Sequence, residues 1–446
     1  MKKYDSYKDS GIEWIGEIPE HWDLKKIKHT TYVKGRIGWQ GLRSEEFKEE
    51  AESLVVTGTD FIDGKINWDS CYQIPIERYN EDINIQLREN DLLITKDGTI
   101  GKVSLVKNMP KIATLNSGVF LTRPSTNAYK TEYMYWVLVS DVFKTFYDYN
   151  KSGSTIQHLY QYVFNEFNFT LPPTEEQTSI ANYLDHKTSQ INHLIAKKEQ
   201  FIKLLEEERV AVINQAVTKG LNPNVPMKDS GVEWLGEIPE HWVVKRIKHL
   251  LSEPLKYGAN ESAEEENLDD PRYIRITDFG NDGKLKANTF KSLPYSKAEN
   301  FLLVEGDILF ARSGATVGKT FFFNNYKGIA CFAGYLIKAS CDRQLLIPEF
   351  LYEFTNTGSY NNWKQSIFQQ STIQNIGADK YNQLKIAIPP ISEQNAIVEF
   401  LKNKSSEIVL IITKAQQEIE LLKEYKTALI SEVVTGKVDV RNEILN

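Results

Sequence analysis

The sequence predicts an α+β protein in which two similar mixed α/β globular domains are joined by two long helices that form an antiparallel coiled coil, with an internal pseudo-twofold repeat. Three observations predict this fold. Two sequence blocks each occur twice at nearly constant spacing. Short strand-like runs fill the segment between the blocks in each copy. A long stretch with helical apolar periodicity then follows each copy.

The clearest repeat is the block that opens each half of the chain. Lys8–Trp22 returns as Lys228–Trp242 with Gly-Glu-Ile-Pro-Glu-His-Trp in both copies, at an offset of 228 − 8 = 220 residues. A second block, Leu171–Gln177, returns as Ile388–Gln394 at an offset of 394 − 177 = 217. A constant frame around a divergent middle is what two related readers of different ligands would show, because variable loops carry function on a fixed scaffold. Gene duplication followed by drift is the alternative.

These blocks divide the chain into four segments. We predict a first globular domain at 1–170, a helical segment at 171–220, a second globular domain at 221–387 and a second helical segment at 388–446. The strand-like runs favour largely antiparallel or mixed sheets with a few short helices. The runs are Leu92–Thr95, Val103–Val106, Ser117–Thr122, Asp307–Ala311, Thr320–Phe323 and Lys385–Ile388, and the short helices lie near Tyr133–Phe146 and Pro348–Phe354.

Each globular domain is followed by a long helix. Thr174 and Gln177 fit a capping box, and Ser392 supplies the second N-cap. No glycine or proline interrupts either stretch before Gly220 and Gly436, so about 40 residues at 1.5 Å each give a rod of about 60 Å. An apolar seam of near seven-residue period needs a helical partner, which favours pairing of the two rods, while separate packing of each rod on its own globule is the alternative. The predicted seam residues are Leu184, Ile191, Ile195, Ile202 and Leu205 in the first helix and Leu401, Ile408, Ile412, Ile419 and Leu422 in the second.

Composition limits the class of protein. The chain has 446 residues, of which 41% are hydrophobic and 25% charged, a mixture typical of globular proteins. No apolar run approaches the ~18 residues that span a bilayer, and three cysteines without a Cys-x-x-Cys pair favour a reducing compartment. We therefore expect a cytoplasmic protein with no membrane partner. The net charge of −7 disfavours a nucleic-acid coat but leaves site-specific binding through local patches open.

One motif is close to a nucleotide-binding loop but lacks its essentials. Ser313–Thr320 contains Gly-Lys-Thr, yet it begins with serine where a P-loop has glycine, and the residues after it favour a strand. The first-half counterpart, Asp97–Val103, lacks the Ser/Thr. We predict instead a glycine-rich hairpin with cations in each half, which either contacts DNA phosphates or forms a solvated turn. We find no methyltransferase motif, metal-ligand spacing or catalytic triad, and we expect structural roles for the frame histidines and tryptophans.

Recognition is the class of function that remains. Lys34–Arg43 is a segment with several glycines that also contains arginine and glutamine. Arginine can make two hydrogen bonds to the edge of a guanine, and glutamine two to the edge of an adenine. The counterpart in the second half, Lys256–Glu261, aligns only loosely and differs throughout. The candidate DNA-contacting residues are Arg36, Trp39, Gln40, Arg43, Lys96, Lys102, Thr155, Gln157, Arg312, Lys319, Thr372 and Gln374.

The doubled frame resembles the specificity subunit of bacterial type I restriction–modification systems. The resemblance rests on Gly-Glu-Ile-Pro-Glu-His-Trp at the start of a variable domain and Pro-Pro-x-x-Glu-Gln at the start of a long helix, both present twice, and it covers the whole chain. It implies that 1–170 and 221–387 are two target-recognition domains, each of which reads one half of a split double-stranded DNA site. The helices after Pro173 and Pro390 would be spacers that dock modification subunits, expected to number two.

The resemblance also implies where the chemistry resides. This chain would not be an enzyme and would hold no cofactor or metal. Modification subunits would carry S-adenosylmethionine, and restriction subunits, which act as translocase and nuclease, would use ATP and Mg; the source would be bacterial or archaeal. Because recognition residues vary within this family, no base contact transfers by motif. A coiled-coil scaffold for partners other than DNA and an NTP-using enzyme built on Gly314–Lys319 stay open as alternatives.

Overall fold

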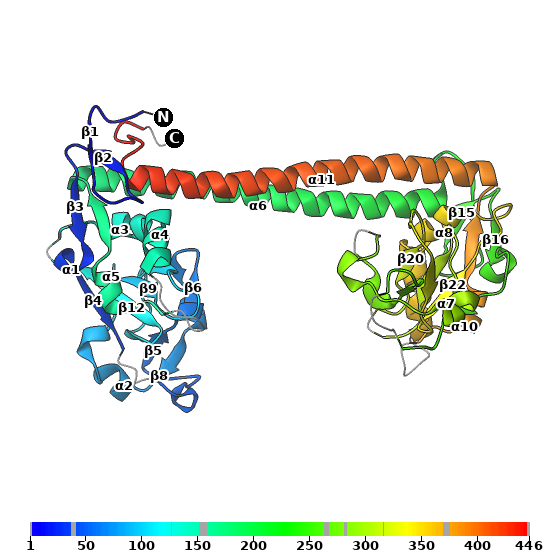
Figure 1. Ribbon diagram of the computed structural model, residues 1–446, viewed down its shortest axis with the longest axis horizontal. Coiled ribbons are helices and arrows are strands. Elements are labelled where there is room, and N and C mark those ends of the chain that lie inside the picture. Colours follow the sequence, from blue (N-terminus) through cyan, green and yellow to red (C-terminus); the bar gives the residue numbers. More distant parts are fainter. Residues whose placement is uncertain are drawn as a thin grey trace. The chain divides into compact units, whose positions relative to one another are not determined.

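The computed structural model describes residues 2–36, 42–125, 127–150, 158–262, 267–280, 283–314, 316–368 and 375–443. Contacts divide the chain into two compact units, one formed by Met1–Lys198 with Gln416–Asn446 and the other by Glu199–Ala415. Each unit holds one globular domain together with a stretch of both long helices (Figure 1). The units therefore cut across the predicted helical segments, because each globule packs with the stretch of helix pair beside it.

The first unit is built on a mixed sheet. Six strands lie in the order β4-β12-β9-β10-β7-β6, and a second sheet has the order β11-β5-β8. Two strand pairs, β10 with β7 and β11 with β5, are parallel, as the prediction of mixed sheets allows. The strands are β1 (Tyr7–Asp9), β2 (Glu17–Pro19), β3 (Asp23–Lys26), β4 (Thr31–Gly35), β5 (Ser53–Val56), β6 (Phe61–Ile62), β7 (Lys65–Ile66), β8 (Tyr72–Ile74), β9 (Leu92–Thr95), β10 (Val103–Leu105), β11 (Ala113–Leu115), β12 (Val119–Pro124) and β13 (Asn168–Leu171). The short helices are α1 (Ile27–Thr30), α2 (Ile76–Asn80), α3 (Thr131–Val139), α4 (Asp141–Asn150) and α5 (Gln161–Asn165).

The second unit repeats this plan. Its four-stranded sheet, β17-β22-β19-β20, corresponds to β4-β12-β9-β10, and the parallel pair β18–β21 corresponds to β5–β11. The frame pair β16–β23 corresponds to β3–β13. The strands are β14 (Met227–Asp229), β15 (Glu237–Pro239), β16 (Val243–Arg246), β17 (Lys256–Tyr257), β18 (Arg272–Ile274), β19 (Ile308–Ala311), β20 (Thr320–Phe322), β21 (Ala330–Phe332), β22 (Leu336–Ala339) and β23 (Lys385–Ile388). The short helices are α7 (Tyr295–Ala298), α8 (Pro348–Phe354), α9 (Gly358–Phe368) and α10 (Ala378–Gln383).

Two long helices, α6 (Thr174–Lys219) and α11 (Ile391–Val434), pair within each unit. In the first unit, Lys198 forms an ion pair with Glu418, and Lys426 Nζ donates to Asn192 Oδ1 at 2.9 Å. Residue numbers rise along α6 as they fall along α11, so the pair is antiparallel. In the second unit, Ile213 and Val217 of α6 share a core with Ile397 and Leu401 of α11.

The predicted apolar seam lies at this helix pairing, and the antiparallel coiled coil is confirmed. Every predicted seam residue is buried or half-buried, because each helix turns its apolar stripe toward the other. The buried residues are Leu184, Ile191, Leu205, Leu401, Ile408 and Ile419, and the half-buried residues are Ile195, Ile202, Ile412 and Leu422.

The predicted helix caps are wrong. Thr174 is already helical, and the side chain of Gln177 does not return to it. Gln177 Oε1 instead accepts from the backbone N–H of Lys130 at 2.7 Å, and its Nε2 donates to the Pro172 carbonyl at 2.8 Å. Ser392 likewise lies inside α11. A buried glutamine that binds another segment cannot also close a capping box, so the motif serves tertiary structure.

Candidate nucleic-acid interface

The two repeated sequence blocks meet in the first unit through one buried carboxylate. Glu176, at the start of α6, accepts from Trp22 Nε1 at 2.9 Å and lies 2.7 Å from His21 Nε2. Tyr4 OH donates to the same carboxylate at 3.1 Å, and burial, together with Glu176, raises the pKa of Tyr4 well above its usual value. The frame motif thus locks the globule to the helix pair and has a structural role.

The same lock recurs in the second unit. His241 Nε2 lies 2.8 Å from Glu393, and Trp242 Nε1 donates to it at 3.2 Å. Gln394 accepts from the backbone N–H of Ile347 at 2.8 Å, as Gln177 does from the residue before α3. Trp242 is fully buried, like its first-half equivalent. The predicted structural roles of these frame histidines and tryptophans are confirmed.

A hairpin turn presents a cation at the end of the central sheet of the first unit. Lys96 follows β9, donates its backbone N–H to the Gly118 carbonyl at 2.9 Å, and accepts at its own carbonyl from Leu159 N–H at 2.9 Å. Its ammonium lies 5.5 Å from the centroid of the Phe120 ring and 3.5 Å from Asp97. Three segments distant in sequence therefore meet at this turn through backbone hydrogen bonds.

The second unit has the same arrangement with other side chains. Arg312 follows β19, donates its backbone N–H to the Tyr335 carbonyl at 3.0 Å and accepts from Ile376 N–H at 2.8 Å. Its guanidinium lies 5.0 Å from the centroid of the Tyr257 ring. Arg312 Nε is buried and makes no hydrogen bond within the described part of the chain. A buried donor without an acceptor is rare in folded proteins, and the Nε atom of Arg272 in the same unit shares this state.

The segment Ser313–Thr320 is the turn of an antiparallel hairpin, as predicted. β19 pairs with β20 through Phe310 opposite Thr320, and Gly314 and Gly318 take positive φ angles of 84° and 78°. A P-loop needs a helix N-terminus at this point, and a strand stands there instead. The geometry gives no support to nucleotide binding.

Among the other predicted DNA contacts, the prediction for Arg36 is wrong. It is only 3% exposed, its Nε donates to the Leu115 carbonyl at 2.8 Å, and its Nη1 lies 3.2 Å from Glu81. Burial lowers its pKa, and Arg36 is a structural residue that joins β4 to the second sheet. The sequence misled because a glycine-punctuated segment with arginine fits both a binding loop and a strand end.

The remaining candidates divide into two groups. Lys102 and Arg43 are exposed and Lys319 is half-buried. Their contacts with DNA stay predictions. The candidates that lie outside the described residues are Trp39, Gln40, Thr155, Gln157, Thr372 and Gln374.

Exposed aromatic rings at the same hairpin ends were not predicted. In the first unit, Tyr160 and Tyr162 are 46% and 67% exposed and stack on each other at 5.5 Å, directly after Leu159. In the second unit, Tyr257 and Tyr335 are 42% and 63% exposed. The alternation of tyrosine with glutamine in Tyr160-Gln-Tyr162 was the sequence signal for such a surface.

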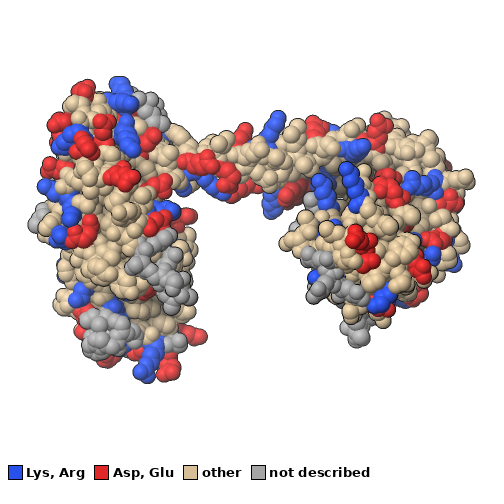
Figure 2. Space-filling view, viewed as in Figure 1, with Lys and Arg blue, Asp and Glu red and all other residues tan. Residues whose placement is uncertain are grey.

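The described residues offer little for catalysis. They hold no group of three or more His, Cys, Asp or Glu side chains that could bind a metal ion. All three cysteines are buried, and burial raises the pKa of each thiol to about 12. No described helix is long and apolar enough to cross a membrane. Acidic and basic side chains are interspersed over the visible surface of both units (Figure 2), so binding depends on local groups.

A family model and several known proteins are similar in sequence to this chain. A family model described as the type I restriction modification DNA specificity domain matches residues 47–204 and 239–421. The MjaVIII specificity subunit of Methanocaldococcus jannaschii is 23% identical over 95% of each chain. The EcoKI specificity subunit of Escherichia coli is 22% identical, over 86% of this chain and 82% of that one.

Solved structures share the fold. A chain from a study of complex assembly in a type I restriction–modification system aligns with a TM-score of 0.72 at 15% identity, covering 94% of this chain and 99% of its own length. The HsdS subunit of Thermoanaerobacter tengcongensis aligns with a TM-score of 0.56 at 14% identity, covering 94% and 98%.

Proposed function

Because the chain belongs to the type I restriction modification DNA specificity family, we propose that each of its two units reads one half of a bipartite DNA site. The resemblance predicted from the doubled frame is thereby confirmed. The chain is a sequence-specific DNA-binding subunit of a type I restriction–modification complex. What we propose beyond this is that each unit reads its own half of the DNA site.

The observation that carries the proposal is the repeated hairpin end with different side chains. In both units a cation follows the central strand and is held by two equivalent backbone hydrogen bonds. Lys96 packs over Phe120 in one unit, whereas Arg312 packs over Tyr257 in the other. The same backbone geometry with different hydrogen-bonding groups suits two readers of different base sequences.

We propose that the helix pair sets the distance between the two half-sites and docks the modification subunits. Outside the seam, α6 and α11 carry apolar side chains that are exposed, among them Leu204 at 54%, Leu410 at 55% and Leu421 at 63%. A contiguous exposed apolar patch marks a protein interface, and we place the docking contact on the helix faces that carry these leucines. The named specificity subunits belong to systems with separate modification and restriction subunits, and we place the S-adenosylmethionine, ATP and Mg chemistry on those subunits rather than on this chain.

Selection from random duplexes tests the reading of a split site. The full chain, in complex with its modification subunits, is expected to enrich two short sequences separated by a fixed unspecified spacer. Enrichment of one continuous sequence would show that a single unit reads the DNA. No enrichment, with binding to a protein partner retained, would favour the scaffold alternative.

Helix length tests the spacing role. Seven residues inserted into each helix at the level of the Lys198–Glu418 ion pair preserve the seven-residue seam and add about 10 Å of helix. Since DNA rises about 3.4 Å per base pair, the spacer should lengthen by about three base pairs while both half-sites stay unchanged. Methylation mapping measures this, and an unchanged spacer would leave the helices only a docking role.

A further inference from the structure

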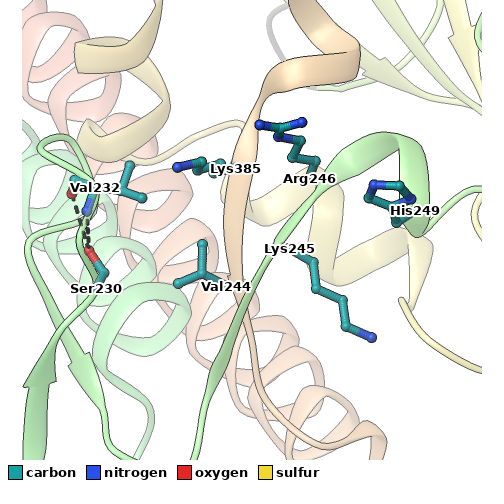
Figure 3. A pocket seen from close by; sticks show the side chains of 7 residues that line it. All are labelled: Ser230, Val232, Val244, Lys245, Arg246, His249 and Lys385. Atoms are coloured by element: carbon teal, nitrogen blue, oxygen red, sulfur yellow. Dashed lines mark hydrogen bonds between the residues drawn. The ribbon is translucent and has the colours of Figure 1, made fainter.

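The second unit carries a basic cluster on the frame strands β16 and β23 and on the single helical turn (Ile247–His249) that follows β16. Lys245, Arg246, Lys248 and His249 are exposed, and Lys385 is half-buried. A shallow pocket of about 540 Å³ is lined by all of these except Lys248, together with Ser230, Val232 and Val244 (Figure 3). The Ser230 hydroxyl is engaged by Val232 of its own turn, so the cationic groups are what the pocket offers to a ligand.

In the first unit, two acids pair with the three cations at the equivalent positions. Lys26 and Lys28 form ion pairs with Glu166 at 2.7 Å and 2.6 Å, and Lys25 lies 3.4 Å from Asp23. The two ammonium groups lower the pKa of Glu166 to about 2, so this carboxylate stays charged at any physiological pH.

Both acids are missing in the second unit. The register of the frame strands makes Val243 the equivalent of Asp23, and the 217-residue offset makes Gln383 the equivalent of Glu166. With histidines neutral, the formal charge of these equivalent positions is 3 − 2 = +1 in the first unit and 4 − 0 = +4 in the second. In the described part of the chain no carboxylate forms an ion pair with the four cations, which are Lys245, Arg246, Lys248 and Lys385.

The strand register adds a second reason for an anion. Arg246 lies directly opposite Lys385 in the antiparallel pair, where the first unit has Lys26 opposite Asn168. Like charges that face each other across a ladder destabilise it, and an anion between them removes the repulsion. The first unit has no facing like charges at this place, and its Glu166 already binds Lys26, whereas in the second unit no described carboxylate pairs with Arg246 or Lys385.

We propose that this cluster binds phosphodiester groups of the DNA flanking the half-site that the second unit reads. The inference rests on the proposed function. Ile376 donates to the carbonyl of Arg312 at the hairpin end, and the six residues of α10, about 9 Å of helix, lead from there toward Lys385. If a duplex that meets Arg312 continues along α10, its phosphates, which carry a charge about every 1.7 Å of helix axis, come within reach of the cluster.

The test transplants the acids of the first unit into the second. In the full chain, the double variant Val243→Asp/Gln383→Glu should lower the slope of log affinity against log salt by about two on a duplex without the site, since each phosphate contact contributes about 0.9. The ratio of specific to non-specific affinity should stay unchanged. The control is Gln344→Glu/Asn361→Asp, which adds the same charge at two exposed positions that do not line the pocket; its slope should match the wild type.

Three results would overturn the inference. One is a Val243→Asp/Gln383→Glu slope equal to that of the control. Another is an unchanged slope with lost binding of the modification subunit, which would assign the cluster to an acidic protein surface. The last is stabilisation of the wild-type chain by inorganic phosphate with no change in slope, which would assign it to a small anion. Site selection by the wild-type chain is measured separately, so its failure refutes the proposed function whatever the slope.

Discussion

In both units, the frame and the hairpin ends are held together by different kinds of hydrogen bond. In the frame, side chains make the bonds: Glu176 binds His21 and Trp22, as Glu393 binds the equivalent pair in the second unit. At the hairpin ends, backbone groups make the hydrogen bonds, such as the one from the Lys96 N–H to the Gly118 carbonyl. A side-chain lock fixes residue identity, whereas a backbone bond leaves it free. This difference explains why the frame sequence repeats and the recognition sequence does not.

The largest effect is expected from exchanging hairpin-end side chains. The variant Tyr257→Gly/Arg312→Lys/Tyr335→Gly gives the second unit the residues at the equivalent first-unit positions, and the backbone bonds should survive. Specific affinity should fall by at least about 10²-fold toward the non-specific level, which for DNA-binding proteins lies about 10³–10⁷ lower. Competitive binding with specific and random duplexes measures the ratio. Retained specificity would show that the bases are read elsewhere.

Removal of a frame tryptophan comes next. Trp22→Ala and Trp242→Ala each empty a site with no solvent exposure, and each should cost about 3–5 kcal/mol of stability. Hydrogen exchange should show the loss in the unit that contains the substitution. If one variant were nearly neutral, the two frames would not be equivalent, and their repeated sequence would not reflect a shared packing role.

A smaller effect should distinguish the two locks. Glu176 accepts from Tyr4 as well as from the repeated Trp and lies close to His21, and its side chain is 11% exposed, whereas that of Glu393 is 26% exposed. Glu176→Gln should therefore cost about 2 kcal/mol and Glu393→Gln about 1 kcal/mol. Urea unfolding followed in each unit gives both values. Equal losses would mean that Tyr4 adds nothing to the first lock.

The smallest effect belongs to the turn lysines. Lys102→Ala and Lys319→Ala should each lower the salt slope of DNA binding by about one phosphate contact and leave site choice intact. Isothermal titration with ATP should show no binding to the wild-type chain or to either variant. A specific ATP affinity that disappears in the Lys319 variant would instead revive the nucleotide-binding alternative for this hairpin.

The sequence predicted the parts of the fold that depend on repeated pattern. The seam of α6 and α11, the β19–β20 hairpin and the structural role of Trp22 follow from apolar period, turn residues and internal repetition. The motif Thr174–Gln177 predicts a cap that does not form, because local sequence cannot show that Gln177 binds Lys130, a contact across 47 residues.

The recognition surface was less predictable for a physical reason. Arg36 and Arg312 both follow a sheet strand, yet one is buried against Glu81 and the other stacks on Tyr257. Which one faces a ligand depends on segments distant in the sequence, such as the one around Thr114, which accepts from Arg36. The only sequence signal for the exposure of Tyr160 and Tyr162 is their alternation with Gln161, a pattern too short to separate exposed from buried tyrosines.

Gly220 and Gly436 follow the two long helices with positive φ angles of 77° and 74°, and each lies against a frame tryptophan. The Cβ position of Gly220 lies 3.4 Å from the Trp242 ring, and that of Gly436 lies 3.1 Å from Trp22. From Gly220 the chain enters the second frame motif through peptide bonds. From Gly436 the first motif is reached through contacts, among them Asp439 N–H to the Lys2 carbonyl at 2.9 Å and Arg441 over the Tyr4 ring at 4.7 Å. The first frame motif is therefore held beside the end of α11 by non-covalent contacts, where the second motif is held beside the end of α6 by the chain itself.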